Sequence, residues 1–274
     1  MKRIVFLRRM AAVLLVLMMG MSVSVGGTAK VLTAEAEAGD RIIFGHYEQD
    51  NNTANGKEPI EWLVLKVDEN TNRALLLSRY GLDARAYRPD AQDADDLLTW
   101  ANSEMRGWMN SSFLNEAFTE AEQRLIAVTT VKTEENAEWM AICEKQNWGY
   151  KPMNGGTETQ DKVFLLSLEE AMEYGGYSTV EEFFSGQGSE KLTAMPTAYA
   201  IAQGAKFMFN SFDINAMLNG QGFCIWWLRS PGGDAYSAFA VISNGGFTID
   251  AADFEGYSVR PALWLDLEVA FAQE

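Results

Sequence analysis

Short apolar runs separated by turn-forming residues occupy both ends of the chain, and helix-type spacing is confined to its middle. The runs 41–45, 60–67 and 74–78 are bounded by Asp, Asn and Thr, a pattern typical of antiparallel strands and hairpins. Apolar runs return after residue 222, separated by glycine-rich turns, and continue to Leu267. Strands at both ends with helices between them predict an α+β fold with antiparallel sheets and helices inserted mid-chain.

The middle of the chain carries several helix-start signals. The segment 103–113 begins with a serine suited to an N-cap and has apolar residues at helical spacing. Sequences of the form Ser/Thr-x-x-Glu, typical of capping boxes, begin at Thr119, Ser167 and Ser178. A further short helix is expected at 197–204, ending at its glycine.

The first 36 residues have the pattern of an export signal. A basic n-region precedes an unbroken apolar run at 11–19, and small residues then offer cleavage after Ala29 or Ala36. The run is short for a spanning helix, and an uncleaved N-terminal anchor is the alternative. We therefore expect a signal peptide at 1–36 and one secreted globular domain at 37–274, with no membrane span after cleavage.

The charge balance narrows the range of partners. The chain has 22 Lys and Arg against 38 Asp and Glu, a formal net charge of −16 at pH 7. Such an acidic chain repels nucleic acid and anionic membrane surfaces. Cations, basic polypeptides and neutral sugars remain as candidate partners, so we expect a glycan or an extracellular protein and no nucleic acid.

Two cysteines, Cys143 and Cys224, would reach an oxidising compartment and could form a disulfide there. In the chain-entropy model a bridge closing so long a loop stabilises the fold by about 4–5 kcal/mol. Cys224 lies among apolar residues, so a small buried hydrophobic side chain is an equally good interpretation.

Two apolar runs near the C-terminus each contain one arginine, Arg229 and Arg260. A guanidinium buried in a strand needs acceptors, because an unpaired buried charge is costly. We predict structural ion pairs with carboxylates such as Glu61, Asp83 or Asp161. The alternative is that the planar guanidinium groups bind an anionic ligand.

The turns of the last fifty residues combine aromatic and hydrogen-bonding side chains. Neighbouring Trp226 and Trp227 point to opposite faces of a strand, so one of them is a candidate for exposure. Loops are also where binding residues concentrate. The predicted ligand-binding residues are Trp227, Asp234, Tyr236, Asn244 and Asp250.

Signatures of catalysis and of metal binding are missing from the sequence. His46 is the single histidine, and there is no Cys-x-x-Cys or Gly-x-Ser-x-Gly motif. The aspartates at 90–96 lack the ligand spacing of an EF-hand loop and are best explained as a solvated acidic loop. We expect no catalytic residue, no metal site and no cofactor.

Several motifs resemble those of a bacterial family of secreted and surface-associated proteins known as a domain of unknown function. They follow the family order and cover nearly the whole exported part. The resemblance implies no catalytic residue, because the family has none assigned. The main motifs are FGHYEQ (44–49), PIEWLVL (59–65), DKVFLLS (161–167), WLRSPG (227–232) and VRPALWL (259–265).

A looser resemblance links the C-terminal strands to C-type-lectin-like and formylglycine-generating-enzyme-type domains. In those folds a Trp-rich strand, a loop, an alternating strand and an arginine-bearing strand also close the domain. This chain lacks the paired calcium motifs of the lectins, since 58–60 reads Glu-Pro-Ile and no Trp-Asn-Asp follows. It also lacks the active-site cysteine arrangement of the enzymes. A likeness of fold does not carry function.

These observations favour a secreted, C-type-lectin-like binding module at the bacterial surface, with a glycan, a wall component or a protein as its ligand. One alternative is an oxidoreductase of the formylglycine-generating type that uses Cys224 and possibly Cys143. The other is a structural unit within a larger surface assembly.

Overall fold

The computed structural model describes residues 36–91, 96–135, 137–147, 155–184, 188–208, 222–232 and 234–267. The predicted signal peptide therefore lies outside the described residues, apart from Ala36. Two aspartates of the acidic loop, Asp93 and Asp95, also lie outside them.

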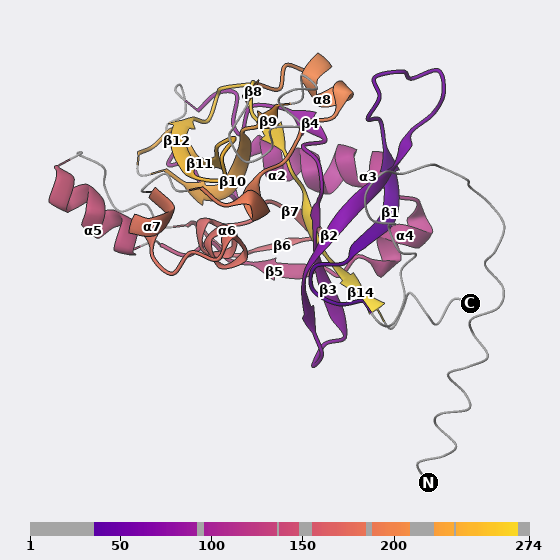
Figure 1. Cartoon of the computed structure of the whole chain (residues 1–274), viewed down its shortest axis with the longest axis horizontal. Helices are drawn as coiled ribbons and strands as arrows, with labels where there is room; N and C mark the ends of the chain where they lie inside the picture. Colours follow the sequence, from indigo (N-terminus) through magenta and orange to yellow (C-terminus); the bar gives the residue numbers. More distant parts are fainter. Residues whose placement is uncertain are drawn as a thin grey trace, which may run out of the picture.

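Two five-stranded sheets form the framework (Figure 1). All pairings in the first sheet are antiparallel, and in the second only β10 and β13 run parallel. The first sheet has the order β1 (Arg41–Tyr47), β2 (Glu58–Asp68), β3 (Arg73–Ser78), β14 (Ala262–Asp266) and β7 (Val163–Phe164). The second has the order β12 (Phe247–Ala251), β11 (Ser237–Val241), β10 (Trp226–Pro231), β13 (Ser258–Val259) and β4 (Asp83–Ala84). Two small sheets pair β5 (Thr129–Val131) with β6 (Thr159–Asp161) and β8 (Phe207–Met208) with β9 (Phe223–Cys224).

The chain passes from one sheet to the other at two adjacent places. The neighbours β3 and β14 of the first sheet are continued by the neighbours β4 and β13 of the second. Backbone hydrogen bonds join the two crossings, from Ser78 N–H to the Pro261 carbonyl at 2.8 Å and from Leu82 N–H to the Val259 carbonyl at 2.9 Å. Arg260 lies at this junction between the two sheets.

Helices occupy the middle of the sequence, and Figure 1 shows α5 and α7 at one end of the molecule and β1, α3 and α4 at the other. The capping boxes predicted at Thr119 and Ser167 are confirmed. At the third predicted position the start of α7 is one residue later, because the Thr179 hydroxyl, not that of Ser178, accepts the Glu182 N–H. The Glu182 carboxylate accepts the Ser178 N–H, so the reciprocal bond of a capping box is not formed at Thr179. The helical segments are α2 (Glu104–Trp108), η1 (Met109–Phe113), α3 (Leu114–Ala117), α4 (Glu120–Leu125), α5 (Ala137–Gln146), α6 (Leu168–Gly175), α7 (Val180–Phe184), η2 (Glu190–Leu192) and α8 (Ala198–Ala202).

One continuous core of buried side chains includes residues of both sheets and of the helices between them. Its largest members include Trp62, Trp100, Trp226 and Trp227, each no more than 1% exposed. The antiparallel sheets with helices inserted mid-chain confirm the α+β class. Within the described residues, no helix combines the length and the apolar character that crossing a bilayer needs.

Candidate ligand-binding groove

A row of three side chains across adjacent strands forms the floor of a groove on the first sheet. Leu75 of β3 is paired with Lys66 of β2 on one side and with Trp264 of β14 on the other. Directly paired residues in antiparallel strands project from the same face, so the three side chains lie side by side. Leu263 and Leu265 are fully buried, and Trp264, which alternates with them, is only partly buried.

Helix α6 forms the wall of the groove that faces this floor. Glu170, Glu173 and Tyr174 follow the i, i+3, i+4 spacing that places side chains on one helical face, and all three line the groove. Leu168 and Ala171 are buried in the core. The helix thus packs one face against the core and leaves polar groups over the floor.

The groove encloses about 660 Å³, a size suited to a small organic ligand. Its floor combines Leu75 and Trp264 with the charged Lys66, and its other charged lining residues are Glu170, Glu173 and Lys191. Apolar and aromatic surface with a few charged groups is the mixture typical of ligand sites. The remaining lining residues are Ala38, Gly39, Val64, Leu65 and Leu166.

Arg229 joins the groove wall to the core of the second sheet. Its guanidinium contacts both Glu170 oxygens, at 2.5 and 3.0 Å, and donates to the Leu165 and Lys132 carbonyls, both at 2.8 Å. Nε donates to the Thr133 hydroxyl at 3.2 Å, so all five donors are used. The predicted structural ion pair of Arg229 is present, but its partner is Glu170.

The carboxylates that we expected to pair with the two buried arginines pair with other arginines instead. Glu61 binds Arg79 at 2.8 Å and lies 3.7 Å from Arg41. The other two expected carboxylates are also paired elsewhere. Asp83 lies 3.7 Å from Arg85, and Asp161 binds Arg106 at 2.8 Å.

Arg260 makes no ion pair with any described residue, which contradicts the prediction. Its Nε donates to the Ser78 carbonyl at 2.9 Å and its Nη1 to the Leu192 carbonyl at 3.1 Å. The guanidinium lies 4.9 Å from the centroid of the Trp226 ring, and Nη2 has no described partner. Burial lowers the pKa of Arg260 to about 10, still far above neutrality, so the side chain remains a cation.

The five predicted ligand-binding residues do not form one site. Trp227 is fully buried and donates its indole N–H to the Arg85 carbonyl, so the prediction that it is accessible is wrong. Asn244 lies in the turn between β11 and β12. The other three predicted residues lie at the opposite, open end of this hairpin. Those three, Asp234, Tyr236 and Asp250, lie near the start of β11 and the end of β12. Tyr236 is 46% exposed, and Asp250 accepts the hydroxyl of Tyr257 at 2.6 Å.

Both cysteines are free thiols in the structure, and both are buried. Cys224 lies beside the crossing between the sheets, where its Sγ is 3.1 Å from the Ala194 carbonyl. Cys143 is on α5, whose Trp139 packs against Phe239. The possible Cys143–Cys224 disulfide is therefore not formed here, and the alternative of small buried side chains describes both.

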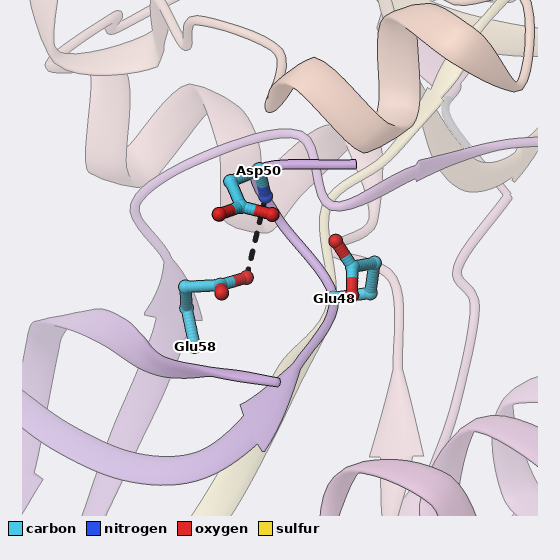
Figure 2. Close-up of side chains that lie close together, drawn as sticks. All are labelled: Glu48, Asp50 and Glu58. Atoms are coloured by element: carbon cyan, nitrogen blue, oxygen red, sulfur yellow. Dashed lines mark hydrogen bonds between the residues drawn. The ribbon is translucent and has the colours of Figure 1, made fainter. Parts of the chain in front are cut away.

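Three carboxylates in and beside the loop between β1 and β2 form a candidate cation cluster, Glu48, Asp50 and Glu58 (Figure 2). One oxygen of each lies within 4.8 Å of the others, and such oxygens are ligands that Ca²⁺ prefers. Glu58 accepts the N–H groups of Gln49 and Asp50, and Glu48 accepts that of Asn52 at 2.8 Å. These bonds account for the clustering, because the carboxylates fix the loop backbone.

The described part of the acidic loop is also internally paired. Asp90 and Asp96 both bind the guanidinium of Arg88, at 3.0 and 2.7 Å.

A smaller hollow of about 300 Å³ lies between β4 and α2, lined by Arg85 and Trp108 among others. Arg85 already stacks on the Trp108 ring at 4.2 Å, so the groove is the stronger candidate site.

The fold and the groove together define an α+β domain with a ligand-sized hollow of mixed aromatic and charged lining. The chain belongs to the family described as Domain of unknown function (DUF6273), whose profile matches residues 71–267. The motifs at 44–49 and 59–65 precede the matched region. No curated protein and no solved structure matches the chain.

Sequence reasoning missed the groove, although part of the signal was visible. Trp264 alternates with two leucines, which indicates a strand whose Trp side chain faces away from theirs. The spacing of Glu170, Glu173 and Tyr174 likewise defines one face of a predicted helix. That these two faces meet depends on the pairing of β14 with β7, the strand before α6, which connects segments about 100 residues apart.

Proposed function

We propose that the protein is an exported bacterial binding module that holds a glycan or another wall component in the groove between α6 and the first sheet. The observation that carries this proposal is the partly exposed Trp264 on the groove floor, surrounded by charged side chains. An indole ring offers a flat apolar surface for the apolar face of a sugar, and the rim groups can hydrogen-bond its hydroxyls.

Two further parts of the proposal come from the sequence. The export pattern of residues 1–36 supports action outside the cytoplasm. The order of the C-terminal strands supports a fold of the C-type-lectin type. The proposal requires export from the cytoplasm. It is compatible with a C-type-lectin type of fold but does not depend on it.

Replacing the floor tryptophan tests the proposal directly. The secreted domain, starting at residue 37, is screened against glycan arrays and against purified bacterial cell walls. Trp264→Ala should weaken the binding of any positive ligand by about tenfold or more, because a lost aromatic contact costs about 1.5 kcal/mol. Trp264→Phe should retain part of the affinity, and circular dichroism should show that both variants are folded.

Tyr236→Ala is the matched control, because Tyr236 is an exposed aromatic residue outside the groove. It should leave binding unchanged. If Tyr236→Ala abolishes binding and Trp264→Ala does not, the ligand binds near Asp234 and Asp250, as the sequence predicted, and the groove assignment fails. A wild-type domain that binds no array glycan and no wall preparation contradicts the proposal as a whole.

The two alternative functions have less support. A thiol-dependent oxidoreductase needs an accessible thiolate. Cys143 and Cys224 are both buried, and burial raises the pKa of both, that of Cys224 to about 11. A structural unit of a surface assembly has no feature of its own in the described residues, and capture of a stoichiometric protein partner would favour it.

A further inference from the structure

We propose that the ligand of this groove is a sugar bearing amino-acid substituents, with both a carboxylate and an ammonium group. This inference rests on the proposed function, since it assigns a chemistry to the same groove. Two opposite charges that line the groove carry it, Lys66 on the sheet floor and Glu173 on the wall formed by α6. Neither forms an ion pair with any described residue.

Lys66 is placed in the groove by an irregularity of β2. The register between β2 and β3 shifts between Val64 and Lys66, and such bulges redirect side chains. The Lys66 side chain is exposed, and it lies in the same cross-strand row as Trp264. An ammonium at this position reaches an anionic group of a ligand that stacks on the indole.

Glu173 faces the floor from the helix wall. Its neighbour Glu170 is engaged, because it accepts the Ser167 N–H of the capping box and both Nη groups of Arg229. Glu173 is one turn further along the same face and is exposed, and no described side chain binds it. Its carboxylate is therefore available to a cationic group of a ligand.

Lys191, the other lysine of the groove, is differently placed. Its ammonium group lies beside Gly176, the C-cap residue of α6. A cation at this position stabilises the C-terminal end of the helix dipole. Lys191 therefore lies at the end of α6, whereas Lys66 lies in the same cross-strand row as Trp264.

Charges of both signs fit the groove better than charges of one sign. Lys66 and Glu173 do not bind each other, so a ligand of one sign satisfies one of them and leaves the other beside a like charge. The net charge of −16 also repels an anionic polymer over long range. A zwitterionic ligand has no net charge, so it avoids that repulsion and satisfies both groups.

Calorimetric titration of the secreted domain with four defined probes tests the inference. The probes are a neutral chito-oligosaccharide, an anionic oligogalacturonate, a cationic chitosan oligomer and a disaccharide–peptide wall fragment with one free carboxylate and one free amine. The disaccharide–peptide should bind most tightly. Lys66→Gln and Glu173→Gln should each weaken its binding by roughly two- to fivefold, as expected for one partly exposed ion pair.

Two exposed, unpaired residues of α5 provide matched controls, Glu144→Gln and Lys145→Gln, because neither lines the groove. Both should leave binding unchanged. The charge probes add a reciprocal readout, which a purely structural effect would not produce. Lys66→Gln should weaken any binding of oligogalacturonate but not that of the chitosan oligomer, and Glu173→Gln should do the reverse.

The outcomes separate this inference from the proposed function. If the neutral probe binds as tightly as the disaccharide–peptide and only Trp264→Ala weakens it, glycan binding stands and the two-charge inference is overturned. Disaccharide–peptide binding that neither charge variant changes overturns it as well. If the wild-type domain binds none of the four probes or purified walls, the proposed function itself fails.

Discussion

A buried guanidinium is stable where its five N–H donors find acceptors, and the two buried arginines meet this requirement to different degrees. Arg229 uses every donor and has Glu170 as a counter-ion. Arg260 has two carbonyl acceptors, an aromatic ring and no described carboxylate. The sequence predicted burial and structural roles for both, but the counter-ion exists for one.

This difference predicts unequal costs for the same substitution. Arg229→Met should lower the free energy of unfolding by about 3 kcal/mol, because it leaves the Glu170 carboxylate and two carbonyls without their partner. Arg260→Met should cost about 1 kcal/mol or less, because it also removes an uncompensated buried charge. Urea denaturation of both variants measures the two values. Equal costs, or a larger cost at Arg260, would contradict this account.

At the scale of elements, helix α6 connects the core with the groove. Its first turn is fixed by the Ser167–Glu170 capping box, and the same glutamate binds Arg229. The capping box was predictable because it depends on residues three positions apart. The ion pair was not, because Glu170 and Arg229 are 59 positions apart and meet only when β10 packs beside the helix.

Removing the cap should therefore affect both stability and binding. Ser167→Ala should lower the free energy of unfolding by about 1 kcal/mol, the usual cost of losing an N-cap hydroxyl. The equivalent change in α4, Thr119→Ala, should cost a similar amount. Only Ser167→Ala should weaken ligand binding, since α4 does not line the groove. Calorimetry and thermal melting measure both, and equal binding by the two variants would argue against α6 as a groove wall.

At the scale of the whole molecule, the matched family region and the structural unit differ in extent. The family profile begins at residue 71, in the turn between β2 and β3. The first sheet, however, includes β1 and β2, which contribute core residues such as Ile42 and Trp62 and the groove residue Lys66. We therefore expect the folded unit to need the strands that precede the matched region.

Truncation tests this requirement. The segment 71–267 should fail to fold as a monomer, because removing β1 and β2 exposes the edge of β3 and the apolar face that they cover. The segment 36–267 should give a cooperative thermal transition and a monomer-sized or discrete oligomeric peak in gel filtration. Cooperative unfolding of 71–267 would show that the first two strands are dispensable.

The sequence by itself determined the features that depend on neighbouring residues. The alternation of apolar and polar positions marked most long strands, and Ser/Thr-x-x-Glu spacings marked two helix starts correctly and one within a residue. It did not indicate α5, whose buried Trp139 and Cys143 form only a short apolar face. Local patterns act over a few residues, so they predict long helices and strands well. Short elements contain too few patterned positions to be predicted as well.

Only the tertiary structure decided which distant groups meet. Strand register placed Lys66, Leu75 and Trp264 in one row, and the packing of α6 placed Glu173 over it. Packing also buried Trp227, which pattern alone left open to solvent. Contacts of this kind join residues far apart in the chain, and their geometry depends on how whole elements pair. For this protein, the sequence specified the elements, and their pairing created the candidate site.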